Sequence, residues 1–132
     1  MKKLILFGAS NFGDEIVQLF RDINKSSHTA QWDIIGFLDD NLEVIGKVRN
    51  GIPVLGTKEW ITKNDINEIY FVCVIGNPKI KAKVVQYLKT NGAKFASGIH
   101  PSVIISETST VGEGTVITAG NILTTNIKVG NH

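Results

Sequence analysis

An apolar residue recurs at every sixth position near the end of this 132-residue chain. The repeated positions, separated mainly by Ser, Thr, Gly, Asn and Glu, are Ile105, Val111, Ile117, Leu123 and Val129. A fixed internal period is the signature of a repeat architecture. A six-residue period suits a three-sided coil, in which each face points one aliphatic side chain into a narrow core and each turn takes about 18 residues. The pattern predicts slightly under two coils from Pro101 onward.

An antiparallel β-meander is the alternative for this segment. A meander favours a period of two, because successive side chains of a strand point to opposite faces. Ile104, Val116 and Ile122 are additional apolar positions that blur the six-residue pattern. The unbroken spacing favours the coil.

The preceding residues, up to about Ser97, alternate between strand-like and helix-like stretches. Short apolar runs bounded by turn residues predict buried strands at 4–7, 32–38 and 69–75. One helix is expected to open at Asp14, and another to run from about Lys79 to Thr90. The apolar residues of the second helix that are expected to face inward are Ile80, Val84, Val85 and Leu88. This alternation is typical of βαβ units with a mainly parallel sheet.

Shorter elements are expected between these units. Asn50-Gly51 is a strong turn signal. Residues 52–55 predict a short edge strand, where a proline is tolerated. Thr57 is a plausible N-cap for a helix over 59–62, and residues 94–96 add a further strand.

A glycine-bearing loop, Gly8 to Gly13, joins the first strand to the first helix. Backbone N–H groups at a helix N-terminus bind anions. Gly8 allows a tight turn, and Gly13 allows the helix to pack closely on the sheet. Ser10 stands where the dinucleotide fingerprint has its middle glycine, and Asn11 readily adopts a left-handed backbone. The loop predicts a phosphate site; a ligand-free turn is the alternative.

Polar residues also follow the second and third predicted strands. Asp39 and Asp40 end the second strand, and Gly76-Asn77 follows the third. Ligands of open α/β sheets bind at the carboxyl ends of the strands, so these loops should converge. Carboxylates there can accept hydrogen bonds from ribose hydroxyls or a base N–H, although a solvated turn or helix cap is the alternative. Backbone approach at Gly76 and the Asn77 amide would complete a nucleotide pocket.

Composition excludes several classes of protein. The net charge of +2 is too small to suggest a nucleic-acid partner, and no apolar run approaches the roughly 20 residues that span a bilayer. The first apolar run ends after four residues at Gly8, so it predicts a strand rather than a signal peptide. Cys73 lies in an apolar run and is expected to be a buried thiol. A cytoplasmic protein is expected.

Several segments together resemble the bacterial sugar O- and N-acyltransferases, typified by the sialic acid O-acetyltransferase and the UDP-4-amino-sugar N-acetyltransferases. The matching segments are LILFGASNFG, GFLDD, GIPVLG, VIGNPKIKAKV and IHPSVIISETSTVGEGTVITAGNILTTNIKVGNH. They run through nearly the whole chain in the family's order. The resemblance implies an α/β fold: a Rossmann-like parallel sheet domain over residues 1–98 that binds a nucleotide-sugar, followed over 99–132 by the incomplete first coils of a left-handed parallel β-helix.

The same resemblance implies the site and its ligands. The residues implied around the phosphate or uridine are Gly8, Ala9, Ser10, Asn11 and Gly13. Asp39 and Asp40 would contact the nucleoside, with Gly76 and Asn77 lining the same pocket. The implied acceptor is a UDP-sugar, the co-substrate is acetyl-CoA, and no metal, nucleic acid or membrane partner is expected. The family's β-helix typically forms a homotrimer, with acetyl-CoA between neighbouring coils of adjacent subunits.

No catalytic residue is expected in this chain. The family's general base is a histidine in a Gly-His-Asp-like stretch about one coil beyond His132. His132 matches an earlier position, His100 is expected to orient the chain into the first coil, and His28 is expected to be solvated. We therefore expect a truncated chain that is inactive in acetyl transfer on its own.

Two other functions share this domain type. One is a nicotinamide-dependent oxidoreductase, against which stand the incomplete glycine fingerprint and the lack of room for a substrate domain. The other is a non-enzymatic module that keeps the nucleotide-sugar pocket.

Overall fold

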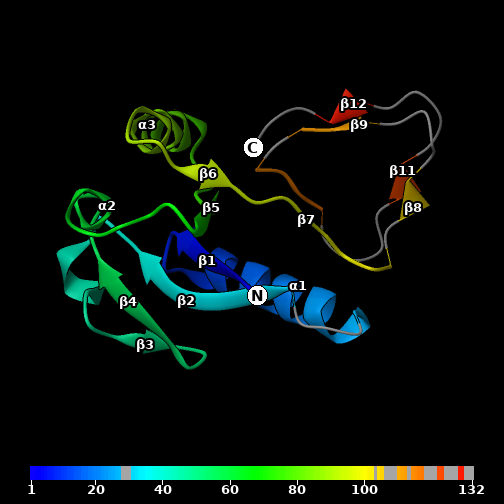
Figure 1. Cartoon of the computed structure of the whole chain (residues 1–132), viewed down its shortest axis with the longest axis horizontal. Helices are drawn as coiled ribbons and strands as arrows, with labels where there is room; N and C mark the ends of the chain where they lie inside the picture. Colours follow the sequence, from blue (N-terminus) through cyan, green and yellow to red (C-terminus); the bar gives the residue numbers. More distant parts are fainter. Residues whose placement is uncertain are drawn as a thin grey trace.

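A six-stranded, mainly parallel sheet forms the body of the structure (Figure 1), a computed structural model. It describes residues 1–27, 31–102, 104–105, 110–112, 114–117, 122–123 and 128–129. The strands of the sheet are β1 (Lys2–Phe7), β2 (Trp32–Leu38), β3 (Val48–Arg49), β4 (Ile52–Gly56), β5 (Ile69–Cys73) and β6 (Lys94–Phe95). Their order across the sheet is β3-β4-β2-β1-β5-β6, and only the β3–β4 pairing is antiparallel.

The strand order is that of Rossmann-type sheets. Numbered along the chain, the parallel strands β1, β2, β4, β5 and β6 stand in the order 3-2-1-4-5. The order reverses between β1 and β5, where Phe7 lies opposite Cys73. Ligands of such sheets bind beyond the carboxyl ends of the strands at this reversal. The expectation of an α/β fold with a parallel-dominated sheet is therefore confirmed.

Both faces of β1 are buried, because a helix covers each of them. Leu4 and Leu6 pack with α1 (Asn11–Ser26), whereas Ile5 and Phe7 pack with α3 (Pro78–Thr90). The short helix α2 (Trp60–Lys63) joins the α3 side through Ile61, and the 3-10 turn η1 (Leu42–Val44) joins the α1 side through Val44. A strand between two helical layers needs apolar residues at every position, which explains the continuous run Leu-Ile-Leu-Phe.

The first helix begins earlier than its acidic residues suggest. It starts at Asn11 with Ser10 as its N-cap, not at Asp14. Asn11 is therefore helical, and the left-handed backbone considered for it is wrong. Gly8, with φ of 129°, makes the sharp turn out of β1 instead. The turn predicted at Asn50-Gly51 is confirmed, since both residues have positive φ.

Three smaller expectations are also wrong. The strand at 52–56 is not an edge strand, because β3 pairs with its outer side. Thr57 does not cap α2: the cap residue is Glu59, and it makes no side-chain capping bond. Ile80 does not face the core but is 52% exposed, while Val84, Val85 and Leu88 are buried as expected.

Beyond the sheet, the chain forms short strands that pair in parallel. They are β7 (Gly98–Ile99), β8 (Ile104–Ile105), β9 (Thr110–Val111), β10 (Val116–Ile117), β11 (Ile122–Leu123) and β12 (Lys128–Val129). The pairs are β7 with β10, β8 with β11 and β9 with β12, and the last two are seen side by side in Figure 1. Parallel pairing contradicts the antiparallel meander considered for this segment.

The register of these pairs repeats the spacing of the sequence. Gly98 pairs with Val116, Ile104 with Ile122, and Thr110 with Lys128, so each pair joins residues 18 positions apart. Three six-residue steps separate the partners in every case. We call this segment, from Gly98 to Val129, the tail.

The start of the tail is fastened to α1. The Nε2 of His100 lies 2.9 Å from the Oδ2 of Asp22, and its Nδ1 accepts the backbone N–H of Ser102 at 3.1 Å. A Cβ on Gly98 would lie 2.7 Å from the Cζ of Phe20, so α1 and β7 are in tight contact there. His100 therefore orients the chain at the junction, whereas His28 and His132 lie outside the described residues.

The single cysteine is buried in the sheet, as expected. Cys73 is 3% exposed, and burial raises the pKa of its thiol to about 11. The thiolate is the reactive form, so we expect Ellman's reagent at pH 8 to label the native protein far more slowly than the denatured protein. In 6 M guanidinium, about one thiol per chain should react rapidly. Labelling of the native chain at the denatured rate would contradict this packing.

Among the described residues, no helix combines the length and apolar character needed to cross a membrane.

Candidate nucleotide site

A cavity of about 290 Å³ opens at the carboxyl edge of the sheet, where the strand order reverses. Its lining comes from the loops after β1, β2 and β5 and from the first turns of α3. The lining residues are Phe7, Gly8, Ser10, Asp39, Asp40, Val74, Ile75, Gly76, Ile80 and Val84. The size is close to the lower end of the range for small-molecule sites, and the position is the one that the fold favours for ligands.

The cavity has an apolar side and a polar side. Val74, Ile80 and Val84 come from the end of β5 and from α3, whereas Asp39 and Asp40 follow β2 on the other side of β1. A flat group with apolar faces and N–H or O–H donors at its edge matches this arrangement. A nucleoside has both features.

Two glycines shape the loop after β1. A Cβ on Gly8 would lie 2.7 Å from the carbonyl oxygen of Val74, and one on Gly13 would lie 2.3 Å from the carbonyl oxygen of Gly8. Gly13 thus lets α1 approach the loop closely, and the ring of Phe37 in β2, 3.1 Å from the same Cβ position, shows the close packing on the sheet that was expected. The turn and the close approach both exclude a side chain at these positions.

Ser10 is the N-cap of α1 and lines the cavity. Its carbonyl oxygen accepts the N–H of Asp14 at 2.9 Å, and its hydroxyl accepts that of Gly13 at a long 3.5 Å. The N–H groups of Asn11 and Phe12 have no acceptor within the helix, because they belong to its first turn. Donors of this kind suit an anionic ligand.

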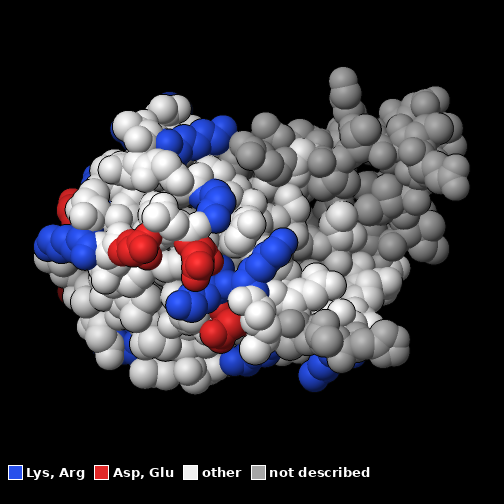
Figure 2. Space-filling model, viewed as in Figure 1, with Lys and Arg blue, Asp and Glu red and all other residues white. Residues whose placement is uncertain are grey.

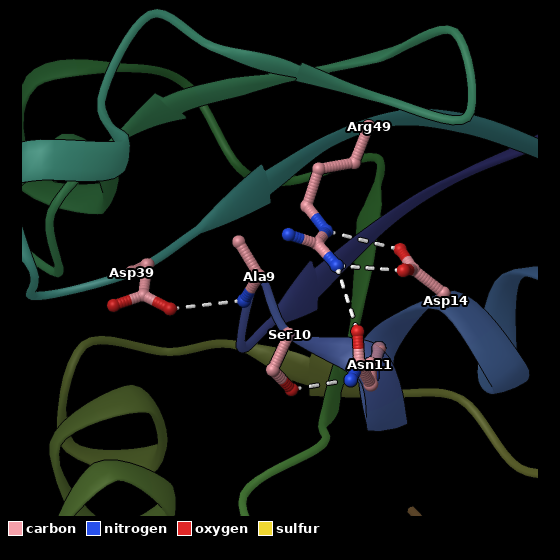
Figure 3. Close-up of polar contacts among 7 residues, drawn as sticks. Ala9, Ser10, Asn11, Asp14, Asp39 and Arg49 are labelled. Carbon is pink, nitrogen blue, oxygen red and sulfur yellow. Dashed lines mark hydrogen bonds and ion pairs between the residues drawn. The ribbon is translucent and has the colours of Figure 1, made fainter.

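Asp39 holds two of the loops together. Its Oδ2 accepts the N–H of Ala9 at 2.9 Å (Figure 3), and its Oδ1 accepts the N–H of Asn41 at 2.8 Å. Ala9 is 7% exposed, so its N–H depends on this protein acceptor. The carboxylate therefore serves the architecture of the site by joining the loop after β1 to the loop after β2.

Asp40 has fewer protein hydrogen bonds than Asp39 and can bind a ligand. Its Oδ1 accepts the N–H of Lys58 at 3.1 Å, and no hydrogen bond to its Oδ2 is present among the described residues. The residue is exposed and lines the cavity. A carboxylate with one occupied and one open oxygen can accept from a ribose hydroxyl or a base N–H.

The loop after β5 contributes through its backbone. Gly76 lines the cavity, and a Cβ there would meet no atom within 4 Å. Asn77 instead caps α3, because its Oδ1 accepts the N–H groups of Lys79 and Ile80 at 3.0 and 3.1 Å. Its amide oxygen is therefore occupied by the helix.

The nine residues expected at the site divide into two groups. Those that line the cavity are Gly8, Ser10, Asp39, Asp40 and Gly76. Those that lie beside it and shape its loops are Ala9, Asn11, Gly13 and Asn77. Sequence reasoning missed the role of Ile80, which was expected in the core but lines the cavity.

Arg49 was also missed, because its partners lie far away in the sequence. From β3 it reaches the first turn of α1, where Nε and Nη2 donate to the two carboxylate oxygens of Asp14 at 3.1 and 2.7 Å (Figure 3). Nη2 also donates to the Oδ1 of Asn11 at 3.3 Å. Hydrogen bonding to the guanidinium lowers the pKa of Asp14 below its usual value. Nothing in the local pattern around Arg49 signals this contact.

Charge is mixed on the surface of the described part. On the face shown in Figure 2, the basic and acidic side chains are interspersed, without a broad patch of one sign. The described residues also contain no group of three or more His, Cys, Asp or Glu side chains placed to hold a metal ion.

Comparison with known proteins points to one family. Residues 3–88 match the model of the PglD N-terminal domain. The GDP-perosamine N-acetyltransferase of Escherichia coli O157:H7 is 26% identical over 125 residues, which cover 95% of this chain and 55% of the relative. The UDP-N-acetylbacillosamine N-acetyltransferase of Bacillus subtilis (strain 168) is 29% identical over 128 residues, which cover 90% of this chain and 52% of the relative.

A solved structure has the same fold. The acetyltransferase domain of PglB from Neisseria gonorrhoeae FA1090, in complex with acetyl coenzyme A, superposes with a TM-score of 0.72 and 25% identity. The match covers 96% of this chain and 60% of that domain. The chain spans about half the length of the curated relatives it matches.

Proposed function

Because this chain belongs to the PglD N-terminal domain family, we propose that it is the acceptor-binding part of an acetyl-CoA-dependent sugar acetyltransferase. The observation that carries the proposal is the cavity at the reversal of strand order, with the α1 N-terminus and Asp40 beside it. Relatives named for a GDP-linked and for a UDP-linked sugar support a nucleotide-sugar as ligand. Both are N-acetyltransferases, which favours an amine as the acceptor group.

In this proposal, the chain's residues hold the nucleotide. The base lies against Ile80 and Val84, Asp40 accepts from the nucleoside, and the first turn of α1 faces the phosphates. Asp39 and Asn77 act through the loops rather than by direct contact. The sugar then projects out of the cavity toward the part of the enzyme where transfer takes place.

Transfer itself follows from the chemistry of the two substrates. The sugar amine attacks the thioester carbon of acetyl-CoA, so that a C–N bond forms and the C–S bond breaks. A histidine of a later coil takes the amine proton, and the CoA sulfur leaves as the thiolate. We propose that residues 1–132 contribute acceptor binding to this reaction.

We further propose that residues 1–98 form the nucleotide-sugar domain and residues 99–132 begin a left-handed β-helix of hexapeptide repeats. Parallel pairs 18 residues apart support the coil, since three six-residue faces make one turn. In the intact protein the coils would associate as a homotrimer with acetyl-CoA between adjacent subunits, as the family resemblance implies. The free, buried thiol of Cys73 supports a cytoplasmic enzyme.

Calorimetric titration of this chain with UDP, GDP and NADH tests the proposal. We expect one nucleoside diphosphate to bind with a dissociation constant in the micromolar range, about −8 kcal/mol, and NADH to bind much more weakly. Tight binding of NADH alone would favour the oxidoreductase. For the intact gene product, release of CoA in the presence of a nucleotide-linked amino-sugar is expected; binding without any turnover would favour the non-enzymatic module.

A further inference from the structure

The guanidinium of Arg49 has two N–H groups that its known contacts leave available. Nε and Nη2 are occupied by Asp14 and Asn11, and no partner of Nη1 is found in the described part of the chain. We propose that Arg49, through Nη1, binds the diphosphate of the nucleotide-sugar. This inference rests on the proposed acceptor-binding function and assigns a phosphate-binding role to a residue outside the cavity lining.

The position of Arg49 supports this role. Its bond to Asn11 places the guanidinium at the first turn of α1, where Ser10 lines the cavity. In Figure 3, Nη1 points away from Asp14, on the side of Ala9 and Asp39. The side chain is 31% exposed, so solvent and a ligand can reach it.

Hydrogen bonds also hold the side chain and its hairpin in place. The guanidinium of Arg49 donates two hydrogen bonds to the carboxylate of Asp14. Arg21 Nη2 donates to the carbonyl oxygen of Asn50 at 2.7 Å, which joins the β3–β4 hairpin to α1. A guanidinium already fixed in place loses little conformational freedom when it binds a phosphate. Asp14 thus orients Arg49 and leaves Nη1 without a partner among the described residues.

The acidic lining of the cavity favours a cation close to the phosphates. Asp39 and Asp40 line the cavity, and none of its described lining residues is Lys or Arg. A nucleoside diphosphate adds at least two negative charges to this acidic edge. A hydrogen bond from a guanidinium N–H to a phosphate oxygen is charge-assisted and strong, and Nη1 of Arg49 can donate one. Lys79, next to Ile80 in the first turn of α3, is the competing cation.

The test compares ligands with and without phosphates. Binding of uridine, UMP and UDP, and of guanosine, GMP and GDP, is measured for the wild-type chain and for Arg49→Gln, using the base that the wild type prefers. We expect Arg49→Gln to weaken the diphosphate about 10- to 100-fold, the effect of losing a hydrogen bond to a charged group. The nucleoside should weaken less than about 3-fold, because Arg49 does not touch the base or ribose.

Two matched variants serve as controls. Arg21→Gln removes the other arginine that joins the hairpin to α1, and should leave the ratio of diphosphate to nucleoside affinity unchanged. Lys79→Gln should leave it unchanged too. If Arg49→Gln weakens nucleoside and diphosphate binding equally, Arg49 only shapes the loop. If Lys79→Gln selectively weakens diphosphate binding, Lys79 binds the phosphate. Either result overturns the inference. A wild-type chain that binds no nucleotide overturns the proposed function itself.

Discussion

Replacement of Gly13 by alanine is expected to destabilise the protein by about 1 to 2 kcal/mol, since the cost of overpacking against backbone, about 3 kcal/mol, outweighs the roughly 1 kcal/mol that alanine gains over glycine in a helix. The added Cβ would lie 2.3 Å from the carbonyl oxygen of Gly8 and 3.1 Å from the ring of Phe37. The first of these is a backbone atom, so α1 or the loop must move. Because that movement opens the turn at Gly8, nucleotide binding should be lost as well. Urea denaturation and calorimetry measure the two effects.

Gly76→Ala is the matched control for this prediction. Gly76 lines the same cavity, but a Cβ there meets nothing within 4 Å and its φ is not in the left-handed region. We expect the free energy of unfolding of Gly76→Ala to stay within about 0.5 kcal/mol of the wild-type value. Equal stability of Gly13→Ala and the wild type would show that α1 does not pack against the loop as described.

Replacement of Asp39 by alanine is expected to cost about 2 to 3 kcal/mol, because two backbone N–H groups lose a charged acceptor. The N–H of Ala9 is the more serious loss, since this residue is buried and water cannot replace the carboxylate. The loops after β1 and β2 would then no longer be joined, so we expect the affinity for a nucleoside diphosphate to fall more than about 10-fold. Denaturation midpoints and titration of the folded variant measure both.

Asp40→Ala separates architecture from ligand contact. Asp40 is exposed and accepts one backbone N–H, from Lys58, so its removal should change stability by less than about 1 kcal/mol. The affinity of Asp40→Ala for the nucleoside diphosphate should nevertheless fall, because the Oδ2 that can accept a hydrogen bond from the ligand is lost. A stable Asp39→Ala beside an unfolded Asp40→Ala would reverse the roles assigned to the two carboxylates.

The strands and helices were largely predictable from local patterns. Leu4 to Phe7 is apolar without interruption because both faces of β1 are covered, and the second strand has the predicted bounds, Trp32–Leu38. The start of α1 was misplaced because Asp14 lies in the first helical turn, whereas the cap is four residues earlier, at Ser10. Acidic residues indicate a helix N-terminus without identifying the residue that begins it.

The site was predictable in location but only partly in detail. Glycines and acidic residues at the ends of strands indicated the edge where Gly8, Asp39 and Gly76 meet. The pattern could not show that both oxygens of Asp39 are taken by backbone N–H groups. It also could not show that Ile80 lines a cavity instead of the core, because a periodic apolar residue looks the same in either place.

By itself, the sequence determined which segments are strands and helices, the loops that meet at one edge, and the 18-residue register of the tail, because these depend on neighbours in the chain or on a fixed period. Only the tertiary structure decided that Arg49 meets Asp14 across 35 positions, that Asp39 joins two loops, and that His100 is held by Asp22. The physical reason is that a polar side chain forms a hydrogen bond with whatever donor or acceptor the fold brings within about 3 Å. The local sequence pattern does not show which partner that is.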